Sequence, residues 1–358
     1  MSYADRHSPL ARYLLVAYAL LIIYASLNPF TGWRDPGISL FDFLGAPLPR
    51  YIVLFDIAAN VVAYIPLGML LVLTFHPRWR GGLAFSGAVA AAFLMSFGLE
   101  ALQHYLPSRI PSNLDLAANF LGGVLGATAG SLFSKRLLRD DSLQTLRYRL
   151  FRDGPRIDLG LVLLGLWLIS LLYPGNSLFG NGDLRAVFSE PGGELHPAEL
   201  FIRFEAGVVG SNIVAVGLLL ALLVGRGQPV RTLFVALLCA ALGVRTVCYG
   251  VLFSSQNLLD WLTPGASLGL AGGVLIVLIT AMLSRPAKVM LCGLALMAAT
   301  ALVNYAPENP YFLAALANWQ QGHFLNFNGF TRVLSVAWPF VAIMYVLGFA
   351  GSRERDRD

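Results

Sequence analysis

Long apolar runs, each bounded by charged residues, Pro or Gly, recur along the whole chain. A run of about 20 apolar residues is long enough for a helix to cross roughly 30 Å of hydrocarbon, because an α-helix rises 1.5 Å per residue. The pattern therefore predicts an all-α fold, a polytopic transmembrane helix bundle of about ten spans. The expected spans are 10–27, 52–75, 82–104, 114–134, 157–173, 200–225, 230–253, 265–284, 287–305 and 332–350.

Composition agrees with a lipid solvent and argues against several other classes of protein. The 358 residues are 57% hydrophobic and 13% charged, whereas soluble domains average about 25% charged. The basic residues lie between apolar runs and are not interleaved with aromatics, which argues against nucleic-acid binding. Cys239, Cys248 and Cys292 all lie inside apolar runs, so we expect no disulfide framework and no zinc site. We expect neither a metal nor a cofactor.

The distribution of Lys and Arg predicts the orientation. Most of the 25 basic residues fall in segments on the side of the N-terminus, and only Arg34, Arg50, Arg109 and Arg185 fall in segments on the other side. The positive-inside rule then predicts a multi-pass protein of a bacterial cytoplasmic (inner) membrane, with N and C termini cytoplasmic. The first apolar run is expected to be an uncleaved span and not a signal peptide. The basic run 135–156 is the strongest orientation signal, with contact to anionic lipid as the alternative interpretation.

Glycine stripes suggest an internal repeat. Gly122, Gly126 and Gly130 recur at four-residue intervals in one span, as do Gly265, Gly269 and Gly273 in another. Such stripes let membrane helices approach closely. The chain is therefore expected to contain two parallel four-helix units plus two terminal helices. The expected parts are 1–135, a four-helix unit; 136–156, a basic cytoplasmic linker; 157–284, a degenerate second unit; and 285–358, the two terminal helices with an outer segment rich in aromatics and Asn.

Ionisable residues inside spans are costly to bury and point to function, and they concentrate in the first unit. Asp56 and Asn60 share one helix face at i, i+4, and Asp115 and Asn119 repeat that spacing. Both pairs lie at the outer end of their spans. Ionisable groups of the second unit are fewer, namely Arg203, Glu205 and Arg245, and Glu205 is expected to pair with an arginine.

A third span ends at the same outer side with further polar residues. Glu100 and His104 share a face, Gln103 lies between them, and the short loop that follows carries Arg109 and Ser112. We expect all these groups to meet and form a ligand-binding site. Each residue also has a structural alternative: Ser112 and Asp115 fit a capping box, Arg109 could neutralise an acid, and the two asparagines could join helices. The expected ligand-binding residues are Asp56, Asn60, Glu100, Gln103, His104, Arg109, Ser112, Asp115 and Asn119.

The order and spacing of these residues, with Pro66-Leu67-Gly68 after Asn60 and Gly122-Gly123 after Asn119, resemble the VanZ-like family over roughly residues 15–135. The stretch from Asn309 to Gly329 resembles the tail of longer bacterial members. The family takes its name from a protein associated with resistance to the glycopeptide antibiotic teicoplanin, so the resemblance implies a cell-envelope membrane protein but names no reaction. The segment Asn304 to Phe330 is expected to form an interfacial aromatic belt, with a lid as the alternative.

Three classes of function fit the sequence. The first is a non-enzymatic protein whose outer cluster binds a polar or amphiphilic ligand, such as a lipid-linked envelope precursor or a glycopeptide antibiotic. The second is a proton- or cation-coupled transporter, motivated by parallel repeats and buried carboxylates. The third is a membrane hydrolase or transferase acting on a lipid-linked substrate, with Glu100 or Asp115 as base and His104 assisting. No Ser-His-Asp order or H-E-x-x-H spacing supports catalysis. Membrane lipid is the one partner that all three share.

Overall fold

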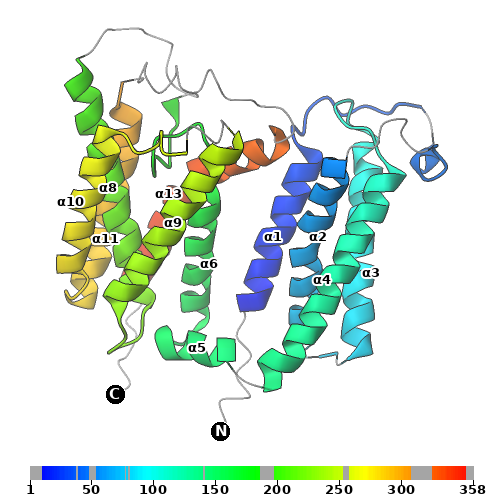
Figure 1. The fold of residues 1–358 in the computed structure, drawn as a ribbon, viewed down its shortest axis with the longest axis horizontal. Coiled ribbons are helices and arrows are strands. Elements are labelled where there is room, and N and C mark those ends of the chain that lie inside the picture. The colour runs from blue at the N-terminus through cyan, green and yellow to red at the C-terminus, as the bar shows by residue number, and fades with distance from the viewer. Residues whose placement is uncertain are drawn as a thin grey trace. The chain divides into compact units, whose positions relative to one another are not determined.

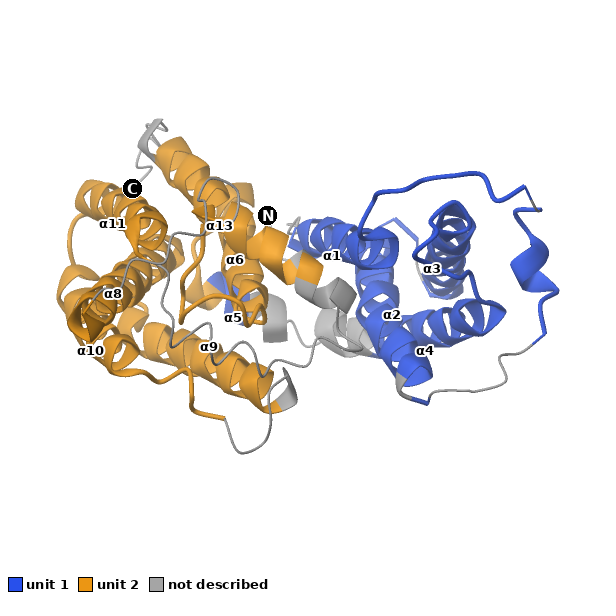
Figure 2. Cartoon of the chain, turned by 90° about the horizontal axis from the view of Figure 1, so that it is seen from above, with its two compact units in different colours: residues 1–148 blue, residues 149–358 orange. Residues whose placement is uncertain are grey.

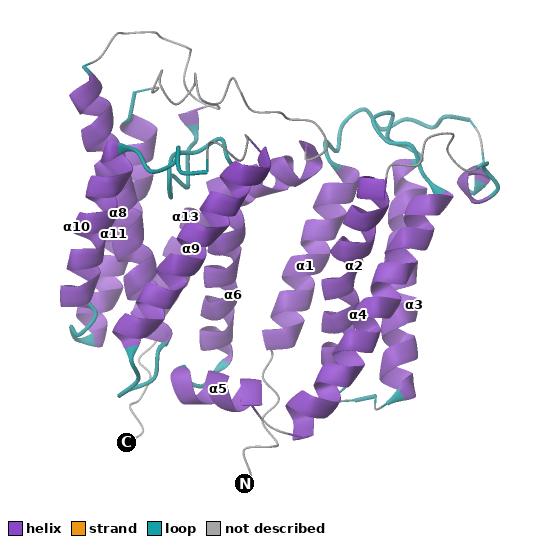
Figure 3. Ribbon diagram, viewed as in Figure 1, coloured by secondary structure: helices purple, strands orange, loops and turns teal. Residues whose placement is uncertain are grey.

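The computed structural model describes the chain as a set of helices (Figure 3). It describes residues 10–37, 39–47, 54–76, 78–79, 81–139, 142–185, 197–252, 258–307 and 325–351. Within these ranges no strand occurs, and a single isolated β-bridge joins Phe151 to Val224. The polytopic helical bundle expected from the sequence is confirmed.

Each expected span overlaps one long helix of the structure. Among the described residues, seven helices are long and apolar enough to cross a membrane: α1, α2, α3, α8, α9, α11 and α13. The other three expected spans fall on α4, α6 and α10, of which α6 has 16 residues and α10 has 17. These two are shorter than the roughly 20 residues of an upright span, so the count of about ten stays a prediction.

The chain divides into two compact units, Met1–Tyr148 and Arg149–Asp358 (Figure 2). In the first unit, α2 packs most extensively against α4, α3 contacts both, and α1 covers α2 (Figure 1). The short helix α5 contains the boundary between the units. The helices that make up the first unit are α1 (Leu10–Leu27), the 3-10 helix η2 (Asp42–Leu44), α2 (Leu54–Phe75), α3 (Gly82–Gln103), α4 (Asn113–Arg139) and most of α5 (Ser142–Leu150).

The second unit is built around α8, which packs against α10 and α11 and is buried over most of its length. Helix α13 closes the unit by packing against α6 and α11. Thr263 fixes the start of α10, because its side chain accepts a hydrogen bond from the backbone of Ala266 and Pro264 occupies the first turn. The helices of this unit are α6 (Pro155–Ser170), α8 (Ala198–Leu223), α9 (Val230–Leu252), α10 (Pro264–Thr280), α11 (Arg285–Tyr305) and α13 (Leu325–Gly351).

The two glycine stripes line the closest helix pair of each unit. A Cβ atom at Gly126 of α4 would lie 2.0 Å from the carbonyl oxygen of Ile65 in α2. A Cβ atom at Gly273 of α10 would lie 3.0 Å from the carbonyl oxygen of Gly210 in α8. The backbones therefore approach so closely that glycine is required on α4, as expected for small-residue packing in lipid.

The outer segment expected to form a belt, Asn304 to Phe330, is only partly covered. Asn304 lies in the last turn of α11, and its side-chain nitrogen donates to the carbonyl oxygens of Thr300 and Gly182. Residues 308–324, including Trp319 and most of the stretch that resembles the tail of longer family members, lie outside the described residues.

Candidate functional site

The first unit brings its polar residues together at one end of the helix bundle. The side-chain nitrogen of Asn60 in α2 donates to Oδ1 of Asp115 in α4 at 2.8 Å. Asp56 lies one turn before Asn60, is exposed, and interacts electrostatically with Asp115. Asp56 and Asn60 of the first predicted pair therefore meet Asp115 of the second across the α2–α4 contact.

Glu100 joins this group from the end of α3. It is 4% exposed, and its Oε2 accepts a hydrogen bond from the backbone N–H of Ser112 at 2.9 Å. Electrostatic interactions link it to Asp115 and to Arg109. We call Asp56, Glu100 and Asp115 the acidic rim.

Ser112 caps α4, in part as the alternative interpretation of Ser112 and Asp115 as a capping box would have it. Its Oγ accepts from the backbone N–H groups of Leu114, at 3.2 Å, and Asp115, at 3.3 Å. In a capping box Asp115 would reach back to the backbone N–H of Ser112. Glu100 takes that N–H instead. Only the Ser112 half of that alternative is therefore present, and the Asp115 carboxylate belongs to the acidic rim.

Arg109 and Gln103 hold the C-terminal end of α1. Arg109 Nη2 donates to the carbonyl oxygens of Ala25, at 2.8 Å, and Asn28, at 3.2 Å, while Gln103 Nε2 donates to Ser26 at 2.9 Å. The last carbonyls of a helix lack partners within it and carry partial negative charge, so a guanidinium and an amide stabilise them. Burial lowers the pKa of Arg109, and the nearby Glu100 opposes that shift.

A second polar layer lies one helix turn deeper. Asn119 in α4 donates to Ser96 Oγ in α3 at 3.0 Å, and both residues are buried. The Tyr64 hydroxyl in α2 lies within hydrogen-bonding reach of Ser96 and interacts electrostatically with Glu100. The sequence interpretation missed Tyr64 and Ser96, although Tyr64 follows Asn60 by four residues and Ser96 precedes Glu100 by four. That spacing was the available signal.

Asn119 contributes one unusual atom to this layer. Its Oδ1 is buried and has no hydrogen-bond partner among the described residues. Buried polar atoms are nearly always hydrogen-bonded, to protein or to ordered water. Asn119 therefore contributes a buried hydrogen-bond acceptor beneath the acidic rim.

His104 lies at the C-terminal end of α3. Its backbone N–H donates to the carbonyl oxygen of Glu100 at 3.3 Å, and its ring packs edge-on against Tyr105 with centroids 5.3 Å apart. The contacts of the described residues thus associate His104 with Tyr105. No group of three or more His, Cys, Asp or Glu within the described ranges could hold a metal ion.

The second unit arranges its charged residues differently from the sequence prediction. Arg245 is 2% exposed and donates to the carbonyl oxygens of Leu171, at 3.1 Å, Tyr173, at 2.7 Å, and Asn176. It therefore caps the end of α6. Glu205 hydrogen-bonds to the side chain of Thr263. The expected pairing of Glu205 with an arginine was wrong, because the backbone at the end of α6 engages Arg245.

Comparison with known proteins identifies the first unit. Residues 10–134 match the model of the VanZ/LLP1 family. Neither a curated protein nor a solved structure matches the chain. The matched range contains the acidic rim and its supporting residues and ends before the second unit. The family resemblance inferred from the residue pattern is thereby confirmed for this part of the chain.

Proposed function

We propose that this VanZ-like membrane protein is a non-enzymatic cell-envelope protein that binds a polar or amphiphilic ligand at the acidic rim. The ligand class is a lipid-linked envelope precursor or a glycopeptide antibiotic, and binding it would contribute to antibiotic resistance. In this proposal the chain lies in a bacterial cytoplasmic membrane with both termini cytoplasmic, so that the rim faces outward.

One observation carries the proposal: the carboxylates of Asp56 and Asp115 lie near each other at an accessible end of the α2–α4 pair. Asp56 is exposed, and hydrogen bonds from the described residues occupy only Oδ1 of Asp115. Ionised carboxylates accept strong hydrogen bonds from ammonium and hydroxyl groups. The rim thus suits the amines and sugar hydroxyls of such ligands.

Arg109 is one of the residues expected from the sequence to bind the ligand, and its Nη2 donates to carbonyl oxygens of α1. Arg109 therefore supports the rim by anchoring α1. Carboxyl groups outnumber guanidinium groups at this end, which favours a ligand with cationic or hydrogen-bond-donating groups.

Apolar side chains beside the rim support an amphiphilic ligand. Leu54, two residues before Asp56, is 79% exposed, and Ile110 in the loop before α4 is 88% exposed. Binding sites for amphiphilic ligands combine apolar side chains with a few polar groups, and these two side chains could contact the apolar part of such a ligand.

Binding to the full-length protein in nanodiscs tests the proposal, with labelled teicoplanin and a lipid-linked peptidoglycan precursor as the two probes. We expect Asp115→Asn to weaken binding of at least one probe by about tenfold, the order expected for loss of one charge-assisted hydrogen bond. Asp42→Asn is the charge-matched control, because Asp42 is an exposed carboxylate of the same unit, at the start of η2, and is not a member of the acidic rim. Unchanged binding of both probes by Asp115→Asn, at equal membrane abundance, would refute the proposal.

The deeper layer of Tyr64, Ser96 and Asn119 is the observation that favours the alternative of proton- or cation-coupled transport. Beyond it, however, α2 and α4 meet backbone to backbone. A Cβ atom at Gly126 would lie 2.0 Å from a carbonyl oxygen, so no side chain or solute fits between the helices there. Uptake of the ligand or of protons by proteoliposomes would favour transport over binding alone.

A further inference from the structure

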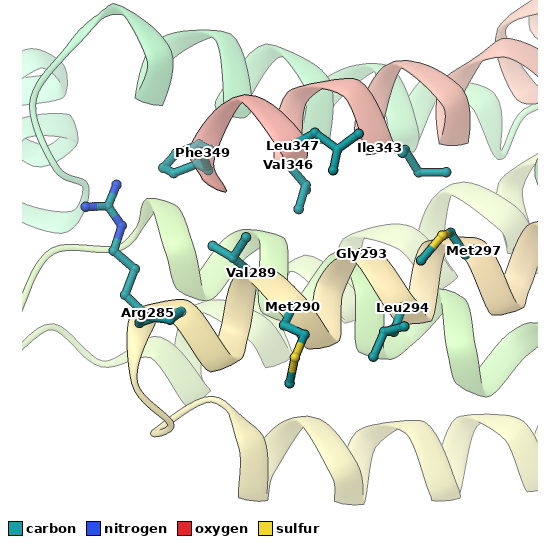
Figure 4. A pocket seen from close by; sticks show the side chains of 11 residues that line it. Arg285, Val289, Met290, Gly293, Leu294, Met297, Ile343, Val346, Leu347 and Phe349 are labelled. Atoms are coloured by element: carbon teal, nitrogen blue, oxygen red, sulfur yellow. The ribbon is translucent and has the colours of Figure 1, made fainter. Parts of the chain in front are cut away.

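The second unit contains an apolar groove between α11 and α13, far along the chain from the acidic rim. Its volume is about 520 Å³, within the range of about 300–1,000 Å³ typical of small-molecule sites. Figure 4 shows α11 and α13 facing each other across it, with Arg285 at one end. Apart from that arginine, the lining is apolar; it includes Val289, Met290, Leu294 and Met297 from α11 and Ile343, Leu347 and Phe349 from α13.

The length of the groove matches one leaflet of a bilayer. The lining residues of α11 run from Arg285 to Met297, which is about 18 Å at 1.5 Å per residue. Half of a hydrocarbon core of roughly 30 Å is about 15 Å. The groove is therefore long enough for an extended acyl chain and too apolar for a polar solute.

Gly293 forms an open part of the groove. A Cβ atom there would meet only Val346, at 4.0 Å. Gly293 therefore has free space beside it in the groove. At Gly126 and Gly273, by contrast, a partner helix fills the corresponding space. A large side chain at position 293 would occupy the groove without pressing on the backbone of α13.

Basic residues gather at one end of the groove. The guanidinium of Arg285 lies over the ring of Phe349, 5.3 Å from its centroid. Electrostatic interactions link Lys288 to Arg285 and to Arg152. The Tyr345 hydroxyl donates to the carbonyl oxygen of Arg156 at 2.8 Å, which ties the start of α6 to α13.

Around this end of the groove, the start of α6 and the start of α11 together carry fewer acidic than basic residues. Asp153 and Asp158 accompany Arg152 and Arg156 near the start of α6, and Asp158 is 2% exposed. Arg285 and Lys288 add positive charge from α11. The residues named here thus include four bases and two acids, and net positive charge near a membrane surface attracts anionic headgroups.

From the apolar groove and its basic end we infer that an anionic phospholipid binds the second unit, with one acyl chain between α11 and α13 and its phosphate beside Arg285 and Lys288. Acyl chains gain little by moving from bilayer to groove, since both are apolar. The preference for this lipid must therefore come from the charge at the end of the groove. The inference concerns residues 149–358 and does not depend on the function proposed for the rim.

Native mass spectrometry of the delipidated full-length protein tests this inference, with phosphatidylglycerol and phosphatidylcholine of identical acyl chains as probes. Phosphatidylglycerol is expected to bind at least about fivefold more tightly, consistent with roughly 1 kcal/mol per basic residue near the surface. Arg285→Gln combined with Lys288→Gln should reduce that preference to about twofold or less, because the remaining contacts are apolar.

A steric pair of variants locates the lipid. Gly293→Phe should weaken binding of both lipids by about tenfold, as expected when a side chain fills the pocket. Gly272→Phe on α10 is the control, because a Cβ atom there meets nothing within 4 Å and the residue is exposed and lies outside the groove. Equal affinity for the two lipids, or unchanged lipid binding by Gly293→Phe in a folded protein, would overturn the inference. A dimer that Gly293→Phe dissociates while lipid binding stays unchanged would identify a second copy of the chain as the occupant instead.

Discussion

In the first unit α4 packs against α2 through glycines, and in the second unit α10 packs against α8 in the same way, yet the two pairs carry different groups at their starts. The first pair carries Asn60 and Asp115 beside the exposed Asp56. The second carries Glu205 and Thr263. The two units therefore share the close packing of one helix pair and differ in the polar residues at the ends of those helices.

The polar groups of the second unit also serve a different purpose. Asn181 donates to Ser170 Oγ at 3.1 Å and accepts from Ser335 Oγ at 3.0 Å, and all three residues are buried. Such a network, in which amides and hydroxyls satisfy one another, fixes a unique packing. The first unit instead leaves carboxylates at an accessible rim. This contrast teaches that the first unit leaves polar groups accessible at the ends of its helices, while the second uses its polar groups to hold its own loop.

The largest expected effect concerns how closely the helix backbones approach each other in the two pairs, α2–α4 and α8–α10. Gly126→Ala should lower the free energy of unfolding by about 3 kcal/mol or more, the upper range of overpacking, because its Cβ atom would lie 2.0 Å from the carbonyl oxygen of Ile65. Gly273→Ala should cost only about 1 kcal/mol, because the corresponding distance is 3.0 Å. Unfolding in mixed micelles measures both.

Gly272→Ala is the control for helix propensity. This glycine has open space around it, so alanine should be neutral or stabilising by up to about 1 kcal/mol. Equal losses for Gly126→Ala and Gly273→Ala would show that the two pairs pack equally closely, against the distances described above.

The next test concerns the arginines that cap the first helix of each unit. Arg245→Met should lower the free energy of unfolding by about 3 kcal/mol, because it leaves buried carbonyl oxygens unsatisfied. Arg109→Met should cost about 1 kcal/mol, because Arg109 is only partly buried and water can replace it. If Arg109→Met lowered the free energy of unfolding more than Arg245→Met, this would contradict the view that Arg245 is enclosed while Arg109 is open to water.

A third test separates binding from stability. Asn60→Leu removes the partner of Asp115 and should weaken ligand binding about threefold, the loss of one positioning hydrogen bond. Thr263→Val removes the side-chain cap of α10 and should lower the free energy of unfolding by about 1 kcal/mol without changing binding. Titration of the two probes and chemical unfolding, run on both variants, would show whether the effects divide in this way. Weaker binding by Thr263→Val would contradict a ligand site confined to the first unit.

The spans were predictable because the hydrocarbon core imposes a length that any sequence must meet. The expected span 230–253 and the observed α9, Val230–Leu252, differ by one residue. The glycine stripes were predictable as contact surfaces for the same reason, since only small residues allow helix backbones to touch in lipid. Helices α6, α8, α9 and α10 also follow α1, α2, α3 and α4 at a similar offset along the chain, and the internal repeat stays a prediction.

The partners of individual polar groups were less predictable. The backbone N–H of Ser112 could be satisfied by Asp115 from its own helix or by Glu100 from another, and only the placement of α3 decides between them. Arg109 and Gln103 act on carbonyls about 80 positions earlier in the chain, a contact that spacing cannot reveal. Tyr64 and Ser96 escaped notice because each lies within an apolar run.

The smallest expected effect distinguishes two buried asparagines. Asn119 Oδ1 and Asn212 Oδ1 are both buried without a hydrogen-bond partner among the described residues. Asn212 in α8 donates only within its own helix, to Val208, whereas Asn119 donates across helices to Ser96. Asn212→Leu should therefore change the free energy of unfolding by no more than about 0.5 kcal/mol, while Asn119→Leu should cost about 1 kcal/mol because it removes a hydrogen bond between α4 and α3. If Asn212→Leu instead cost as much as Asn119→Leu, its oxygen would have to meet a donor, and the second unit would hold a polar site comparable to the first.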